Sequence, residues 1–383
     1  MSPMISWTEA GSECTARWRS ESGMPPPKRV VIADDTMRTD RAYRLACEGT
    51  ALLWRGDFHN ARQLLQAMSR RADRKPRNPV PSLAEGTPPI PGRVFHLHRQ
   101  AKSQRARMLA MILIPLDADY TIPLRRAPDI RQACTEVFGE SSEPSVVSLR
   151  ELLGLVGAHE WRKKGVEIPC LNARIHPHYG VFSPVRGEYV ELVNSAPLPQ
   201  AFPRPELAFD IGTGTGVLAA VLAHRGIKRI VATDQDPRAL ACARENISRL
   251  GLDAQVEIVQ ADLFPAGKAP LVVCNPPWIP ARPSSPIEYA IFDPDSRMLR
   301  GFLGGLAEHL EPDGEGWLVL SDIAEHLGLR TREELLALFE ASGLKVAERL
   351  DVRPHHAKVA DDTDPLHTAR AKEVTSLWRL AGR

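Results

Sequence analysis

The sequence predicts an α/β fold for its C-terminal half, built on a mostly parallel sheet. A glycine-dense turn, residues 212–216, lies between the apolar run Leu207–Phe209 and an apolar helical run that begins at Val217. Three further apolar runs follow, and each of them ends in a polar residue. Helical patterns separate these runs, and strands that alternate with helices are typical of parallel sheets.

The polar residues at the ends of the four predicted strands are Asp210, Asp234, Asp262 and Asn275. Because the carboxyl ends of parallel strands share one edge of a sheet, we expect these side chains to lie together, where open α/β sheets bind ligands. One aspartate alone would more simply be a helix cap or a turn residue. Three of them behind a glycine-rich turn, which lets a ligand approach the backbone closely, indicate a binding site.

The fourth strand runs directly into the tetrad Asn275-Pro276-Pro277-Trp278. With the glycine turn and the three aspartates, it resembles the class I S-adenosylmethionine (SAM) methyltransferases that methylate nitrogen. Residues 180–383 are similar to the HemK-like glutamine methyltransferases and to the small-domain ribosomal RNA guanine methyltransferases. The resemblance implies a Rossmann-like fold with a seven-stranded, mostly parallel sheet, and SAM as cofactor. Trp278 departs from the Tyr or Phe that is more frequent in this motif.

Each part of SAM needs a different partner. We expect backbone N–H groups of the turn to receive the carboxylate of the methionine tail and Asp210 to accept from its ammonium group. Asp234 can accept from both ribose hydroxyls, since a carboxylate has two acceptor oxygens, and Asp262 from the adenine amine. The candidate cofactor-binding residues are therefore Asp210, Gly212, Thr213, Gly214, Thr215, Gly216, Asp234, Asp262, Leu263 and Asn275.

The tetrad supplies the candidate catalytic residues Asn275, Pro276, Pro277 and Trp278. A planar nitrogen becomes nucleophilic only when its lone pair leaves conjugation. The side-chain oxygen of Asn275 and the backbone carbonyl of Pro276 can accept its two N–H hydrogens, and the prolines fix the backbone there. Trp278 offers a flat face for stacking the acceptor. A proline-rich turn without catalytic function is the alternative.

A segment upstream of the glycine turn adds two candidates for cofactor or substrate contact, Phe182 and Arg186. The resemblance suggests them, because a proline-containing segment at this distance covers the cofactor in HemK-like enzymes. The alternative is a connecting hairpin that packs on the catalytic domain, and for Arg186 this alternative is slightly favoured.

The pattern divides the chain into four parts. Residues 1–38 are expected to be a poorly ordered extension, and residues 39–165 an α-helical N-terminal domain that docks the substrate. Residues 166–204 read as a connecting segment of strands and turns, and residues 205–383 as the SAM-binding catalytic domain. Residues 1–110 contain 19 Lys and Arg against 10 Asp and Glu. This basic excess favours an anionic partner such as RNA or the ribosome, although solvated basic helix faces explain it equally well.

The favoured function is methyl transfer from SAM to a planar nitrogen of a macromolecule, either a glutamine amide in a translation protein or an exocyclic amine in RNA. A small-molecule N-methyltransferase is the alternative with the same chemistry. A NAD-dependent oxidoreductase would use the same glycine turn but leaves the tetrad unexplained. A non-catalytic binding subunit is disfavoured, since Asp210, Asp234 and Asn275 are all present.

Length and composition limit the number of domains, the location of the protein and the kinds of site that it can contain. The 383 residues allow two or three domains, and the six scattered cysteines form no CxxC pair, which favours a reducing, cytoplasmic location over a disulfide framework. No apolar run approaches the roughly 20 residues of a membrane span. No metal site is expected, because His355-His356 and Asp361-Asp362 read as a solvated loop. The oligomeric state stays open.

Overall fold

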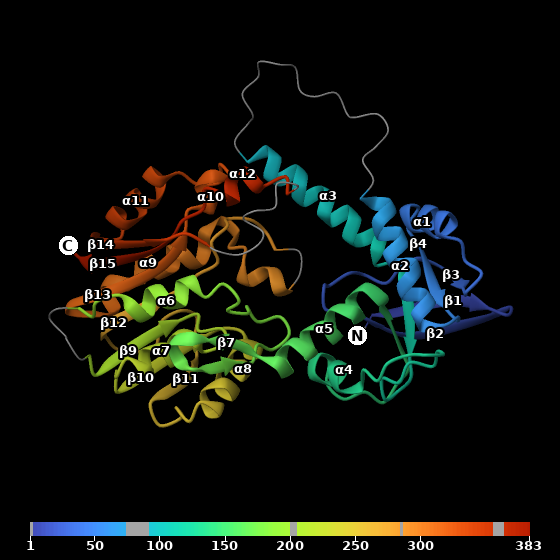
Figure 1. Ribbon diagram of the computed structural model, residues 1–383, viewed down its shortest axis with the longest axis horizontal. Coiled ribbons are helices and arrows are strands. Elements are labelled where there is room, and N and C mark those ends of the chain that lie inside the picture. Colours follow the sequence, from blue (N-terminus) through green and yellow to red (C-terminus); the bar gives the residue numbers. More distant parts are fainter. Residues whose placement is uncertain (1–2, 74–91, 200–204, 284–285, 355–363) are drawn as a thin grey trace, which may run out of the picture. The chain divides into compact units, whose positions relative to one another are not determined.

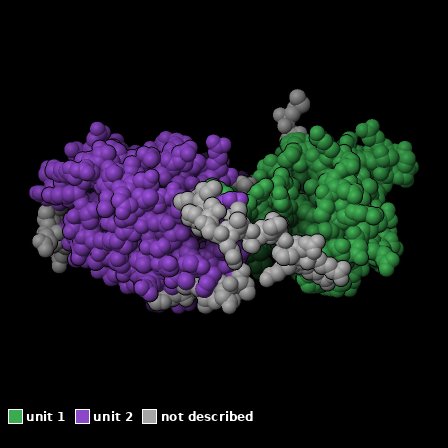
Figure 2. Space-filling view, turned by 90° about the horizontal axis from the view of Figure 1, so that it is seen from above, with its two compact units in different colours: residues 1–89, 96–160 green, residues 90–95, 161–383 purple. Residues whose placement is uncertain are grey.

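The computed structural model describes residues 3–73, 92–199, 205–283, 286–354 and 364–383. Two compact units divide the chain. Unit 1 comprises residues 1–89 and 96–160, and unit 2 comprises residues 90–95 and 161–383 (Figure 2). The proline-rich stretch at residues 76–93, expected from its composition to be a linker or a surface crossing, lies largely outside the described residues. The His355-His356 and Asp361-Asp362 pairs lie entirely outside them. Within the described parts, no helix is both long and apolar enough to cross a membrane.

Unit 2 contains a seven-stranded sheet in the order β11-β10-β9-β12-β13-β15-β14 (Figure 1). Its strands are β9 (Leu207–Ile211), β10 (Arg229–Asp234), β11 (Val256–Gln260), β12 (Ala269–Cys274), β13 (Leu310–Ser321), β14 (Leu344–Val352) and β15 (Thr375–Gly382). The first five are parallel, and β15 is antiparallel to both of its neighbours. The predicted mostly parallel, seven-stranded Rossmann-like sheet is therefore confirmed.

The strand order reverses beside β9. From β9 the chain builds outward to β10 and β11, and then returns to place β12 on the other side of β9. Such a reversal leaves a crevice at the carboxyl ends of the two central strands, because their connecting helices lie on opposite faces of the sheet. The glycine turn follows β9 and the tetrad follows β12, so the fold brings both motifs to this crevice.

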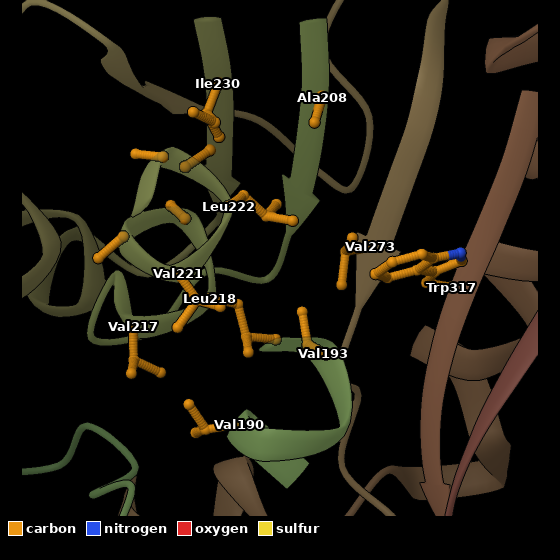
Figure 3. Packing of buried hydrophobic residues seen from close by; sticks show 14 of the residues in the cluster. Val190, Val193, Ala208, Val217, Leu218, Val221, Leu222, Ile230, Val273 and Trp317 are labelled. Atoms are coloured by element: carbon orange, nitrogen blue, oxygen red, sulfur yellow. The ribbon is translucent and has the colours of Figure 1, made fainter. Parts of the chain in front are cut away.

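Alternate residues of the strands pack on opposite faces of the sheet. One face carries α6 (Glu188–Ser195), α7 (Val217–His224) and α8 (Pro237–Arg249), and its core includes Ala208, Val273 and Trp317. The other face carries α9 (Arg297–His309) and α11 (Arg332–Ala341), and its core includes Phe209 and Val272. Figure 3 shows the first core, with α7 side chains beside those of α6 and with Trp317 next to Val273. Burial on both faces explains why the central strands are continuous apolar runs.

Local signals set the helix boundaries in unit 2. Asp236 caps α8, with its side chain accepting from Arg238 N at 2.9 Å. Thr331 and Glu334 form a capping box at the start of α11. The shorter helical elements are η2 (Pro286–Ala290), η3 (Pro294–Ser296), α10 (Ile323–His326) and α12 (His367–Arg370).

The segment 166–204 differs in part from the predicted strands and turns. It contains a two-stranded sheet of β7 (Val166–Ile168) and β8 (Ala173–Ile175), joined through the 3-10 turn η1 (Pro169–Leu171). Residues 189–193, where the apolar pattern suggested one of these short strands, lie instead in the helix α6. Its apolar residues at 189, 190, 192 and 193 have helical spacing and are all buried against the first core.

Unit 1 corrects two predictions. Residues 1–38 are not a poorly ordered extension, because their described part forms three strands. Residues 39–165 are not purely helical, because they add three more strands to the same six-stranded sheet, in the order β1-β2-β6-β5-β4-β3. These strands are β1 (Met4–Glu9), β2 (Ser12–Arg19), β3 (Arg29–Ala33), β4 (Thr50–Trp54), β5 (Ile112–Leu116) and β6 (Ser145–Ser148).

The helices expected in residues 39–165 are present, four of them between these strands and the fifth after β6. They are α1 (Thr39–Cys47), α2 (Phe58–Ala72), α3 (Arg93–Leu109), α4 (Arg131–Phe138) and α5 (Leu149–Lys164). The missed strands have physical causes. Ala10 and Gly11, both with positive φ, close a tight β1–β2 hairpin whose exposed face is polar, so no long apolar run marks it. The buried strands β4 and β5 directly follow helices and read as extensions of helical runs.

Candidate functional site

The Asp210 carboxylate holds the glycine turn and α7 together. Asp210 is 1% exposed, and its Oδ2 accepts from Thr213 Oγ1 at 2.6 Å and from Ala219 N at 3.1 Å. Ala219 lies in the first turn of α7, where backbone N–H groups lack helical partners. Gly216, the residue before the helix, has no side chain to cap them, so Asp210 serves as a cap from the preceding strand. Burial raises the pKa of Asp210 to about 6.

Positive φ angles explain the glycines of the turn. Gly212, Gly214 and Gly216 have φ values of 71°, 56° and 81°, which side chains rarely tolerate. A Cβ on Gly212 would lie 2.4 Å from Met298 Cε of α9. The buried Thr213 donates its N–H to Thr233 O at 2.8 Å, which ties the turn to β10. Thr215, also buried, accepts at its carbonyl oxygen from Asn246 Nδ2 of α8 at 3.1 Å.

Asp234 reaches the glycine turn from the end of β10. Its Oδ2 accepts from Gly214 N at 3.0 Å, and its Oδ1 accepts from Asp236 N at 3.0 Å. Burial raises the pKa of this carboxyl. The structure therefore brings Asp210, Asp234 and the turn into one hydrogen-bonded group, as their strand-end positions predicted.

Asp262 and Leu263 follow β11 at the same edge. Asp262 is exposed and forms an ion pair with Arg297 at 3.5 Å. Leu263 has a φ of 74° and packs against the core on the α9 side. A Cβ on Gly301 of α9 would lie 2.6 Å from Leu263 Cδ1, so glycine allows this helix to approach. Neither Met298 nor Gly301 was among the predicted residues, since contacts of α9 with the site leave no motif in the sequence.

The tetrad lies across the crevice from the glycine turn. Cys274, the last residue of β12, pairs with Ile211 of β9, so Asn275 and Gly212 leave neighbouring strands at the same level. The indole Nε1 of Trp278 donates to Asn275 Oδ1 at 2.9 Å. Since a carbonyl oxygen has two lone pairs, Asn275 keeps one for a ligand. Pro276 is buried, and Pro277 and Trp278 are half-buried.

Trp278 packs against three hydrophobic clusters of unit 2. One of them contains the buried Phe95, whose ring centroid lies 6.3 Å from that of Phe292. Sequence reasoning missed Phe95, which is distant from the tetrad in the sequence. Phe182 is half-buried against the first core, which Trp278 also contacts. Arg186 donates from Nη1 to Glu373 Oε1 at 3.0 Å, a partner that the sequence did not suggest.

The residues present fit SAM. In the turn, Gly212 and Gly214 are partly exposed whereas the other three residues are buried, Asp234 lies at the tip of its strand, and the Asn275 oxygen has an acceptor position left. No cluster of metal-ligating side chains occurs in the described part of the chain.

The buried Asp210 predicts a pH dependence. Its pKa in the folded protein, about 6, exceeds the ordinary value of 3.8, so the folded state holds the proton more tightly. The free energy of unfolding therefore falls as the pH rises from about 4 to about 6. Asp210 alone contributes up to about 3 kcal/mol to this fall. Urea unfolding of Asp210→Asn and wild type at a series of pH values should give a difference in unfolding free energy that changes over this window. A constant difference would contradict the assignment, because the other buried carboxyls are common to both proteins.

Comparison with known proteins shows what the part of the chain that carries these motifs is similar to. The model of the methyltransferase small domain matches residues 172–344. The release factor glutamine methyltransferase of Cereibacter sphaeroides is 33% identical over 175 residues, which are 42% of this chain and 58% of that protein. The ribosomal protein L11 methyltransferase of Sorangium cellulosum is 33% identical over 153 residues, 40% of this chain and 41% of that protein. The chain thus spans about half the length of these relatives.

Among solved structures, the ribosomal protein L11 methylase of Lactobacillus delbrueckii is similar with a TM-score of 0.35 and 18% identity, covering 51% of this chain and 80% of that one. The family model and the seven-stranded sheet agree with the expected family, whose cofactor is SAM. Residues 172–344 therefore match the methyltransferase small domain, and the chain is similar in this part to HemK-like, class I methyltransferases.

Proposed function

We propose that this protein is a SAM-dependent N-methyltransferase that acts on a planar nitrogen, and that its acceptor is a glutamine amide in a protein of translation. The observation that carries the proposal is the pairing of Cys274 with Ile211. It places the tetrad and the glycine turn at the ends of adjacent parallel strands, where a methyl donor and an acceptor nitrogen can meet.

The glycine turn and Asp234 would hold the cofactor, which supplies an electrophilic methyl group when bound, and the buried Asp210 would contribute by fixing the turn. The hydrogen bond from Gly214 N to Asp234 fixes the carboxylate beside the turn before any ligand arrives. Asp262 and Leu263 lie at the next strand end, where the adenine would be held. Pre-organised polar groups of this kind lose little free energy to reorganisation on binding.

Asn275 and Pro276 would orient the acceptor nitrogen. The Trp278 indole fixes the Asn275 amide with its oxygen as acceptor, and the remaining lone pair receives one N–H of the substrate. The carbonyl of Pro276 receives the other. Drawing both hydrogens away from the amide plane makes the nitrogen lone pair available, so positioning would supply most of the catalysis.

The glutamine amide is preferred because similarity extends to release factor glutamine methyltransferases and to ribosomal protein L11 methyltransferases, both named for protein substrates. An exocyclic amine in RNA and a small solute have the same nitrogen chemistry. A docking role for unit 1 is part of the proposal. In its basic helix α3, Arg105 is held by Asp73 through two hydrogen bonds of 2.7 and 2.8 Å, which reduces the charge that this face offers to RNA.

Asp234→Ala should weaken SAM binding about ten- to a hundredfold, because hydrogen bonds to a charged group are lost. Isothermal titration of the full chain with SAM measures the change. Asp253→Ala, an exposed aspartate beyond the end of α8, is the matched control and should bind SAM as wild type does. Unchanged affinity in Asp234→Ala would show that the ribose partner lies elsewhere.

Asn275→Ala should lower methyl transfer about a hundred- to a thousandfold, as expected when one pre-organised polar contact of a reacting group is removed. SAM affinity should stay within a few-fold. The assay incubates enzyme, labelled SAM and cell extract and then separates protein, RNA and small solutes. Label in protein, lost in Asn275→Ala and retained in the control Asn194→Ala, supports the proposal. Label in RNA or small solutes would overturn the acceptor assignment, and turnover by Asn275→Ala would overturn the role of this residue.

A further inference from the structure

A buried ion pair, Arg186 with Glu373, borders the tetrad and takes no part in the methyl transfer proposed above. Glu373 is 3% exposed, and its Oε1 accepts from Ser321 Oγ at 2.8 Å and from Arg186 Nη1 at 3.0 Å. Its Oε2 is buried and finds no hydrogen-bond partner among the described residues. A buried carboxylate with one unpaired oxygen is costly, so a purely structural role explains it poorly.

The strand register places this pair beside the acceptor position. Ser321 ends β13, and Leu318 of the same strand pairs with Cys274 of β12. With strands about 4.8 Å apart and about 3.3 Å between residues, Ser321 lies about 8 Å from Asn275. In addition, Phe182, four residues before Arg186, packs on the same core as Trp278. The Arg186–Glu373 pair and the tetrad at residues 275–278 therefore border one region at the carboxyl edge of the sheet.

Arg186 is the member of the pair that can meet a ligand. Its side chain is 21% exposed, whereas that of Glu373 is 1% exposed. A guanidinium has five N–H donors in a planar fork, and among the described residues only Glu373 takes one of them. The adjacent carboxylate neutralises the arginine, so the pair offers hydrogen-bond donors without a net positive charge. Such a donor suits a neutral carbonyl oxygen better than a phosphate or a carboxylate.

We propose that Arg186 binds a neutral carboxamide carbonyl of the methyl acceptor and that Glu373 is the positioning residue that sets this preference. The inference rests on the proposed function and deepens it, because it favours a peptide acceptor over an anionic nucleic acid. Glu373 fixes the direction of the guanidinium and cancels its charge, and Arg186 donates to the carbonyl oxygen.

Direct binding of two small probes tests the proposal without requiring turnover. N-acetylglutaminamide carries a neutral carboxamide, and N-acetylglutamate α-amide carries a carboxylate in the same place. Their affinities for the full chain are measured by saturation-transfer NMR with S-adenosylhomocysteine present. Wild type should bind the neutral probe at least tenfold more tightly. Glu373→Gln should reverse or abolish this preference, because Arg186 then keeps its charge. Arg186→Met should lose at least tenfold in affinity for the neutral probe.

The buried pair of Arg379 with Glu315, at the opposite end of β13 and β15, provides the matched control. Glu315→Gln breaks a similar ion pair away from the tetrad and should leave the probe preference unchanged. Retained binding of S-adenosylhomocysteine shows that each variant is folded. An unchanged preference in Glu373→Gln, or no binding of the neutral probe by wild type, would overturn the inference. The extract assay tests the methyltransferase function separately, since it scores transfer to any acceptor.

Discussion

The buried carboxylate of Asp210 is the interaction on which the rest of the site depends. The turn after β9 needs glycine at 216 to reverse direction, and glycine removes the side chain that would cap α7. Asp210 replaces that cap from the strand itself, through Ala219 N, and also fixes Thr213. Burial makes its charged form costly, but the positive end of the α7 dipole offsets part of this cost. The turn is thereby held in one conformation.

Sheet topology then decides what faces the turn. Because β12 returns beside β9 and is parallel to it, the residues after β12 meet the glycine turn across the crevice, and Asn275 comes to lie there. The helix α9 closes the same region from the other face, where Asp293 caps it by accepting from Met298 N and Leu299 N. That cap sets the position of Met298 against Gly212. The site is thus assembled by turn, tetrad and α9 together.

The sequence predicted those parts whose causes are local. The central strands of unit 2 are buried on both faces and appear in the sequence as apolar runs. Asp236 and Thr331 mark the starts of the helices α8 and α11. In unit 1, β1 and β2 do alternate polar with apolar residues, which is a strand signal that the prediction of a poorly ordered extension overlooked. The strands β4 and β5 follow helices after only two residues and read as part of the helical pattern. The contact of Arg186 with Glu373 joins residues 187 positions apart, and it forms only when the segment before α6 and the residues before β15 come together in the folded protein. Such contacts depend on the assembled fold rather than on any local pattern.

The course of the chain argues against treating residues 161–383 as a self-sufficient catalytic unit. Residues 90–95 belong to unit 2, and Phe95 is buried there with Ile323 and Leu366 in the cluster that Trp278 also contacts. A large aromatic side chain buried in this way contributes roughly 1.5–3 kcal/mol by removal of apolar surface from water. Removing it would leave an apolar cavity in the cluster against which Trp278 packs, so the packing around the tetrad includes a residue that the chain supplies before the rest of unit 2. The packing of unit 2 therefore includes a segment that precedes residue 161 in the chain.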